Sequence, residues 1–233
     1  MKNDWAQNQN KSVASLASVQ SVYHSKINNF MKKEIFDHLS KDQKMAVIMP
    51  LMTLPEIEMH SDIYVDLLGS IVSQQLSVKA AATINGRFLD LFPKRQPWAE
   101  LVLGLDTEIL RGCGLSYQKA GYIKNIAQYW LDNQSDKKDW RTIDEDEIIA
   151  ELTQIKGVGK WTVQMILMFR LNRLDVFPID DLGIRQGMIK LYEVEETGKA
   201  LVKRLTEIAE PWRPYRTIAC RHIWKWKDTI IAG

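Results

Sequence analysis

The sequence has few of the features that mark extracellular, membrane or metal-binding proteins. Only two cysteines occur among 233 residues, Cys113 and Cys220, and neither stands in a CxxC or Cys/His pattern. This excludes a disulfide framework and the usual zinc or iron–sulfur sites. No apolar run approaches the roughly 20 residues of a membrane span, and the first residues lack the apolar core of a signal peptide. We therefore expect a soluble protein with two buried, structural thiols.

The sequence also lacks a large excess of either positive or negative charge. The 31 lysines and arginines and 29 acidic residues leave a net charge of +2. A protein that binds nucleic acid through a broad cationic face usually carries more positive charge, so any such contact must be local. The hydrophobic share of 45% and the charged share of 26% are ordinary for a globular chain, which is long enough for one sizeable core or two small ones.

Helical periodicity dominates the sequence, and strand signals are scarce. Apolar residues recur at helical spacing behind residues that favour helix N-termini. The predicted N-caps are Ser61, Ser77, Asp106, Ser116 and Thr142, the last in a capping box with Glu145. The segment 160–170, KWTVQMILMFR, is apolar almost all round and predicts a helix buried on most of its surface. These patterns predict an all-α fold.

A Gly-x-Gly turn separates two of the predicted helices. Residues 152–163 read LTQIKGVGKWTV, with Gly157, Val158 and Gly159 between helical patterns. Glycine permits a tight turn and close approach to another chain, and it leaves the first N–H groups of the next helix facing outward. Such a helix N-terminus favours an anion, for instance a DNA phosphate. Taken alone, the motif more often marks an ordinary turn.

Beyond this hairpin, residues 175–185 read DVFPIDDLGIR, a loop with two adjacent acids. The hairpin followed by this loop resembles the helix-hairpin-helix DNA glycosylase superfamily, and most of all the DNA-3-methyladenine glycosylase II family. The resemblance covers approximately 62–226 and continues through 71–81 (IVSQQLSVKAA), 114–123 (GLSYQKAGYI), 211–215 (PWRPY) and 222–224 (HIW). It implies a compact form without the strand-rich N-terminal domain of larger relatives.

The resemblance implies one essential aspartate at the mouth of a base pocket. Asp180 and Asp181 both occupy the loop, and relatives carry an aliphatic residue three positions after the catalytic aspartate. Ile184 stands three positions after Asp181, whereas Gly183 stands three positions after Asp180. We therefore predict Asp181 as the catalytic residue. The alternative is that Asp181 only caps the following helix and Asp180 is a solvated loop charge.

Other site residues are likewise implied by the resemblance. Trp161, Trp224 and Met165 match positions that line the base pocket; some relatives have tyrosine at the position of Met165. The DNA-binding positions are Gln75, Leu76, Gly157, Val158, Gly159 and Lys160, and Leu76 would fill the gap that an extruded base leaves. Its alternative is a core leucine at a helix start. The carbonyl groups of Thr153, Ile155 and Val158 match positions that hold a monovalent cation in relatives.

The resemblance predicts a monofunctional DNA N-glycosylase that excises 3-methyladenine-type alkylated bases from double-stranded DNA in base excision repair. Relatives that also cut the backbone carry a lysine where this chain has Trp161, and use it to form a Schiff base. After base flipping, Asp181 would assist hydrolysis of the N-glycosidic bond. We expect no cofactor, no membrane contact, a monomer, and a place in the bacterial cytosol or eukaryotic nucleus. The alternatives are a glycosylase for another damaged or mismatched purine, and a non-catalytic damaged-DNA-binding module.

We expect two helical lobes with a cleft for DNA and the base between them. Residues 62–185 would form the central lobe, which ends in the hairpin and the aspartate loop. Residues 1–61 and 186–233 would form the other lobe.

Overall fold

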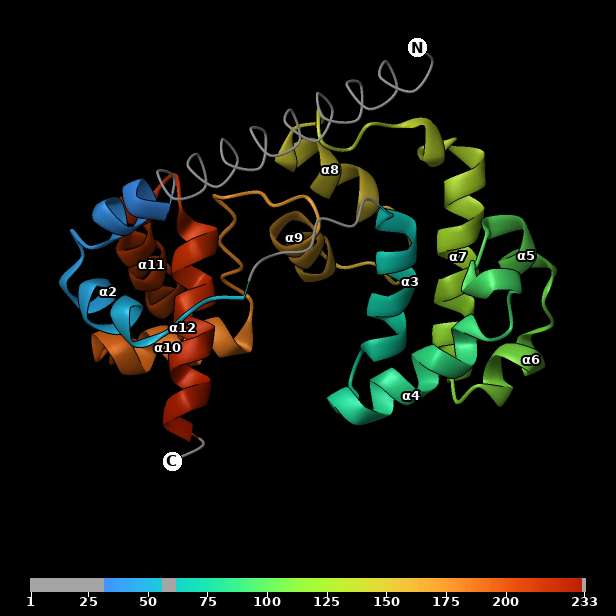
Figure 1. Ribbon diagram of the computed structural model, residues 1–233, viewed down its shortest axis with the longest axis horizontal. Helices are drawn as coiled ribbons and strands as arrows, with labels where there is room; N and C mark the ends of the chain where they lie inside the picture. The colour runs from blue at the N-terminus through green and yellow to red at the C-terminus, as the bar shows by residue number, and fades with distance from the viewer. Residues whose placement is uncertain (1–31, 56–61, 232–233) are drawn as a thin grey trace, which may run out of the picture. The chain divides into compact units, whose positions relative to one another are not determined.

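The computed structural model describes residues 32–55 and 62–231, and their regular secondary structure is entirely helical (Figure 1). The prediction of an all-α fold is confirmed. The first described residues, 32–39, are helical. Among the described helices, none combines the length and the apolar character needed to cross a membrane. Two compact units divide the chain, a terminal unit (1–54 and 186–233) and a central unit (55–185).

The central unit is built around α7, which packs against α3, α5 and α6. Its helices are α3 (Ile63–Ser73), α4 (Val78–Leu89), α5 (Ala99–Gly104), α6 (Thr107–Gly112), α7 (Tyr117–Asp132), α8 (Glu145–Leu152) and α9 (Lys160–Phe169), with 3-10 turns η2 (Pro93–Arg95) and η3 (Ser135–Lys137). Fully buried side chains of these helices, such as Leu67, Phe88, Ile123 and Leu167, form its core. Their removal from water stabilises the unit.

Side chains of the residues before the helices decide where most of them begin. The confirmed N-caps are Ser77, Asp106 and Ser116. Two predictions are wrong: α3 is capped by Asp62 rather than Ser61, and α8 by Asp144 rather than Thr142. The Thr142 hydroxyl instead donates to the Asp139 carbonyl at 2.8 Å, so it is used in the preceding turn, while Asp144 accepts the N–H of Asp146 in the first turn of α8.

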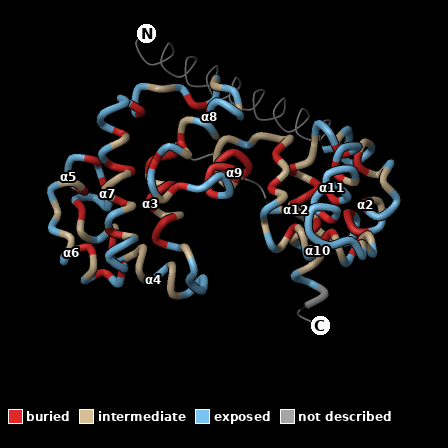
Figure 2. Tube along the Cα trace, turned by 180° about the vertical axis from the view of Figure 1, so that it is seen from behind, coloured by how far each residue is buried: buried red, intermediate tan, exposed pale blue. Residues whose placement is uncertain are grey.

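The helix α9 is the most buried one near the predicted site. Buried residues fill its middle and its C-terminal half, which are largely red in Figure 2. The prediction of a helix buried on most of its surface therefore holds there. It fails at Trp161, which is 44% exposed in the first turn. A large aromatic ring is thus available at the surface directly after the hairpin.

The terminal unit packs its helices around Asp42 and Trp212. Its elements are α2 (Gln43–Ile48), η1 (Met49–Leu51), α10 (Leu182–Tyr192), α11 (Gly198–Ala209), η4 (Glu210–Trp212) and α12 (Arg216–Ile231), of which α10 starts in the last residues of the central unit. Asp42 caps α2 and accepts hydrogen bonds from Tyr192 Oη at 2.8 Å and Trp212 Nε1 at 3.0 Å. Burial, with the nearby Asp42 carboxylate, raises the pKa of Tyr192. One aspartate thus joins three elements of the unit.

Candidate active site and DNA-binding turns

The Asp181 carboxylate accepts hydrogen bonds from a side chain and from a backbone N–H of the central unit. Its Oδ2 accepts the indole N–H of Trp161 at 2.8 Å, and its Oδ1 accepts the backbone N–H of Ile184 at 2.8 Å. Asp180 is exposed. Asp181 therefore caps α10, as the alternative interpretation of this residue predicts. It also bonds to the Trp161 side chain, which capping alone does not require. Two donors from different elements orient its oxygens.

A hollow of about 700 Å³ lies between α3 and α9, within the size range of small-ligand pockets. Its lining includes Trp161, Met165 and Phe169 from α9, Ser70 from α3, and Gln75 from the turn that follows α3. Because Trp161 also donates to Asp181, the hollow and the carboxylate share one side chain. The structure thus brings Trp161, Met165 and Asp181 to one place.

Other polar groups of the hollow were missed by the sequence analysis. Arg170 and Asp66 form an ion pair across it, with Nε and Oδ1 2.9 Å apart. The predicted residue Trp224 lies half-buried on α12 of the terminal unit, and its part in a base pocket stays a prediction.

The Gly-x-Gly hairpin joins α8 to α9 by a turn that requires glycine. Gly157 has φ +110°, and a Cβ there would lie 2.3 Å from Cγ of Tyr122, too close for any side chain. Asn125 Nδ2 donates to the Lys156 carbonyl at 3.1 Å, so α7 supports the turn twice. Gly159 is the N-cap of α9 and has no side chain to cap it. The first turn of α9 thus suits an anion.

The remaining predicted hairpin residues lie in or beside this turn. Lys160 is exposed. The Ile155 carbonyl accepts the Val158 N–H at 2.9 Å, while Thr153 Oγ1 donates to the Ile149 carbonyl. Phosphate binding and a carbonyl-held cation at Thr153, Ile155 and Val158 stay predictions. The described residues contain no group of three or more His, Cys, Asp or Glu side chains that could hold a metal ion.

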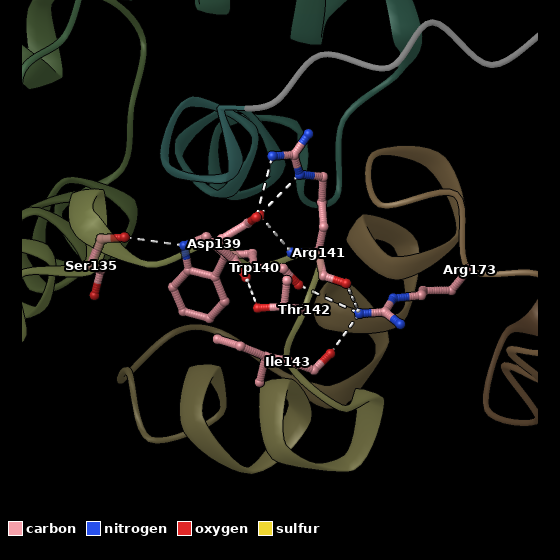
Figure 3. A network of polar contacts seen from close by, with 7 residues as sticks. All are labelled: Ser135, Asp139, Trp140, Arg141, Thr142, Ile143 and Arg173. Carbon is pink, nitrogen blue, oxygen red and sulfur yellow. Dashed lines mark hydrogen bonds and ion pairs between the residues drawn. The ribbon is translucent and has the colours of Figure 1, made fainter.

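Arg173 follows α9 and bonds to the loop that precedes α8, at the end of these helices away from the Gly-x-Gly turn. No sequence signal identified it. Its Nη2 donates to the backbone carbonyls of Arg141 at 3.1 Å, Trp140 at 3.4 Å and Ile143 (Figure 3). Trp140 is in turn held by a bond from its Nε1 to the Ser135 carbonyl, at 3.1 Å. The loop that enters α8 and the loop that leaves α9 are therefore joined by one guanidinium group.

The turn between α3 and α4 exposes two of the predicted DNA-binding residues, Gln75 and Leu76. Gln75 is exposed and has φ +57°, in the left-handed region. Leu76 is 38% exposed and is not a core residue, contrary to its alternative interpretation. An apolar side chain at the tip of an exposed turn has the placement that a gap-filling residue needs.

Comparison with known proteins relates most of this chain to one family. Residues 68–214 match the model of the HhH-GPD superfamily base excision DNA repair protein. DNA-3-methyladenine glycosylase 1 of Schizosaccharomyces pombe is 39% identical over 165 residues, which cover 70% of this chain and 71% of the relative. Among solved structures, the S. pombe 3-methyladenine DNA glycosylase in complex with abasic DNA matches at 33% identity and a TM-score of 0.72, covering 84% of this chain and 97% of that one. The Bacillus halodurans DNA-3-methyladenine glycosidase matches at 31% identity and a TM-score of 0.73, covering 84% and 89%.

Proposed function

Because this chain belongs to the HhH-GPD superfamily of base excision DNA repair proteins, we propose that it is a monofunctional DNA N-glycosylase that excises alkylated bases. The observation that carries the proposal is the bond from Trp161 to Asp181 beside the hollow of α3 and α9. The bond orients the carboxylate, and the same Trp161 lines a space within the size range of small-ligand pockets. Relatives of both kinds, by sequence and by structure, are named as 3-methyladenine glycosylases.

The chemistry needs one carboxylate. Cleavage of an N-glycosidic bond passes through a sugar with oxocarbenium character, and a fixed negative charge near C1′ stabilises it. At about 4 Å and an effective dielectric constant of 20, this attraction is worth roughly 4 kcal/mol, or about a thousandfold in rate. An N-alkylated purine already carries a positive charge and leaves as a neutral base without a general acid. Water adds to C1′ and loses a proton, which gives the abasic site. Asp181 supplies the charge in this proposal.

The damaged base must first leave the duplex. Extrusion costs less for a base whose pairing or stacking is weakened. Leu76 enters the space that the base leaves, and the uncapped N-terminus of α9 with Lys160 binds the strand's phosphates. Trp161 presents an aromatic face to a cationic base in the hollow. These local contacts need no large net charge.

We further propose that the enzyme has no lyase activity. Lyase relatives use a lysine amine where this chain has Trp161, and the indole N–H is occupied with Asp181. Borohydride added to the enzyme with abasic DNA then traps no covalent complex. A trapped complex would show that an amine of this chain attacks C1′.

The enzyme acts on double-stranded DNA as a monomer, in the bacterial cytosol or the eukaryotic nucleus.

The experiment that tests the function is the release of free bases from alkylated DNA, measured by chromatography. The wild-type protein should release methylated purines, and Asp181→Asn should release them about a thousandfold more slowly, from the charge attraction above. Asp180→Asn is the matched control, since Asp180 is exposed, and should keep its rate. A folded Asp181→Asn protein with full activity would refute the mechanism. Binding of abasic DNA without any base release would favour a non-catalytic damage-binding module.

A further inference from the structure

The C-terminal end of α3 is completed by a side chain from another helix. Its last backbone groups have no partner within the helix. The N–H of Gln74 bonds to the carbonyls of Ser70 and Ile71, and the N–H of Leu76 to the carbonyl of Ser73. The carbonyls of Val72 and Gln74 still require donors at this end.

Lys119 supplies those donors from α7. Its Nζ donates to the Val72 carbonyl at 2.9 Å and to the Gln74 carbonyl at 2.6 Å. Burial lowers the pKa of this ammonium. A positive charge at a helix C-terminus is favourable because it faces the negative end of the helix dipole. The two bonds bracket Ser73, and the second is made to the residue directly before Gln75.

Gln75 makes this support necessary. It has φ +57°, a conformation that helix ends usually give to glycine, and that strains other residues. A turn of this shape persists only where surrounding contacts hold it. Lys119 holds it from the inside, while Gln75 and Leu76 stay exposed on the outside.

We propose that Lys119 is a positioning residue for DNA engagement: it holds the turn 74–76 in the conformation that presents Leu76 to the duplex. The inference rests on the proposed function, in which Leu76 fills the gap left by the base. It adds a residue that touches neither DNA nor the base. Without Lys119, the turn samples other conformations, and binding must first restore the productive one.

The placement of Lys119 on α7 strengthens the inference. Tyr122 and Asn125 follow at intervals of three residues, so the three side chains lie along one side of the helix. Tyr122 packs against Gly157, and Asn125 bonds to the Lys156 carbonyl. One side of α7 thus supports both exposed turns, and Lys119 is its contact with the turn of Leu76.

A double-mutant cycle of Lys119 and Leu76 tests the proposal through the affinity for abasic-site DNA. Lys119→Met keeps the apolar stem and removes the donors, and should weaken binding about tenfold, the equivalent of ~1.4 kcal/mol. Leu76→Ala should weaken it as well, and the double variant should lose little more than Leu76→Ala alone, because Lys119 acts through Leu76. Lys124→Met, on the same helix, removes the same charge and should bind as the wild type does.

Salt dependence separates positioning from a direct phosphate contact. Removal of a lysine that contacts a DNA phosphate lowers the slope of log affinity against log salt by about 1. Lys119→Met should keep the wild-type slope. Three results would overturn the proposal. These are a reduced salt slope for Lys119→Met, wild-type affinity of the folded Lys119→Met protein, and a double variant whose loss of affinity equals the product of the two single losses. If Lys119→Met does not fold by circular dichroism, Lys119→Arg, which keeps the charge but changes the reach, enters the same cycle with the same criteria.

The result is distinct from a failure of the proposed function. Base release by the wild-type protein tests the function, whereas the cycle uses binding to DNA that already lacks the base. A protein that binds abasic DNA but releases no base would refute the function, and the cycle would still decide the role of Lys119.

Discussion

Trp161→Phe tests how much the bond to Asp181 contributes to catalysis. The substitution keeps an aromatic ring at the hollow and removes the N–H that Asp181 Oδ2 accepts at 2.8 Å. A hydrogen bond to a charged group contributes about 1.5–3 kcal/mol. Because Trp161 is 44% exposed, water compensates part of the loss, and the lower end applies. The Ile184 N–H still holds Oδ1, so the carboxylate stays but is less well oriented. We expect kcat to fall about tenfold.

Single-turnover release of methylated purines from alkylated DNA measures this effect separately from product release. The rate should fall about tenfold while KM changes by less than about twofold, since the lost interaction orients a group that acts in the transition state. Trp98→Phe, at an exposed tryptophan outside the hollow, is the matched control. Thermal unfolding confirms that both variants fold. Equal rates for the two variants would refute the assignment of the Trp161–Asp181 bond to catalysis.

Three further predictions concern the hairpin and the terminal unit. Gly157→Ala should destabilise the protein by roughly 1–3 kcal/mol, because its Cβ meets Tyr122 at a positive φ; Gly121→Ala, with open space around it, should not, and denaturant unfolding compares them. Lys160→Gln should lower the salt slope of DNA binding by about 1, and an unchanged slope would exclude a phosphate contact. Burial lowers the pKa of His222 to about 4 from 6.5, so the unfolded chain binds the proton first and stability falls as the pH drops from 6.5 towards 4. His222→Gln should weaken that loss in thermal unfolding at pH 7 and pH 5, and an identical loss would contradict the assignment.

Short-range features of the site were predictable because neighbouring residues determine them. The helix starts at Ser77, Asp106 and Ser116 depend on a side chain and N–H groups two or three positions later. The Gly-x-Gly turn depends on a conformation that glycine alone adopts easily. Where polar residues competed within a few positions, as at Thr142 and Asp144, pattern alone chose wrongly.

The family resemblance extends along most of the chain. Within it, the interval to Ile184 favoured Asp181 over Asp180, and the same resemblance identified the hairpin and Leu76. These predictions concern residue types at fixed intervals. The intervals survive in the sequence because a helix or a tight turn has a fixed geometry. The sequence therefore determined the all-α class and the order of the helices along the chain.

Tertiary structure decided which of these residues touch one another. The indole of Trp161 reaches Asp181, 20 residues away; Lys119 reaches carbonyls 45 and 47 residues back; and Arg173 bonds to three carbonyls about 30 residues earlier. No local pattern encodes such pairs, because a polar side chain in a loop or on a helix face has the same sequence pattern whether or not it bonds to a distant acceptor. The packing of α7 against α3 brings Lys119 to its carbonyls, and only in the folded chain does Asp181 become an oriented carboxylate bonded to a side chain that lines the hollow.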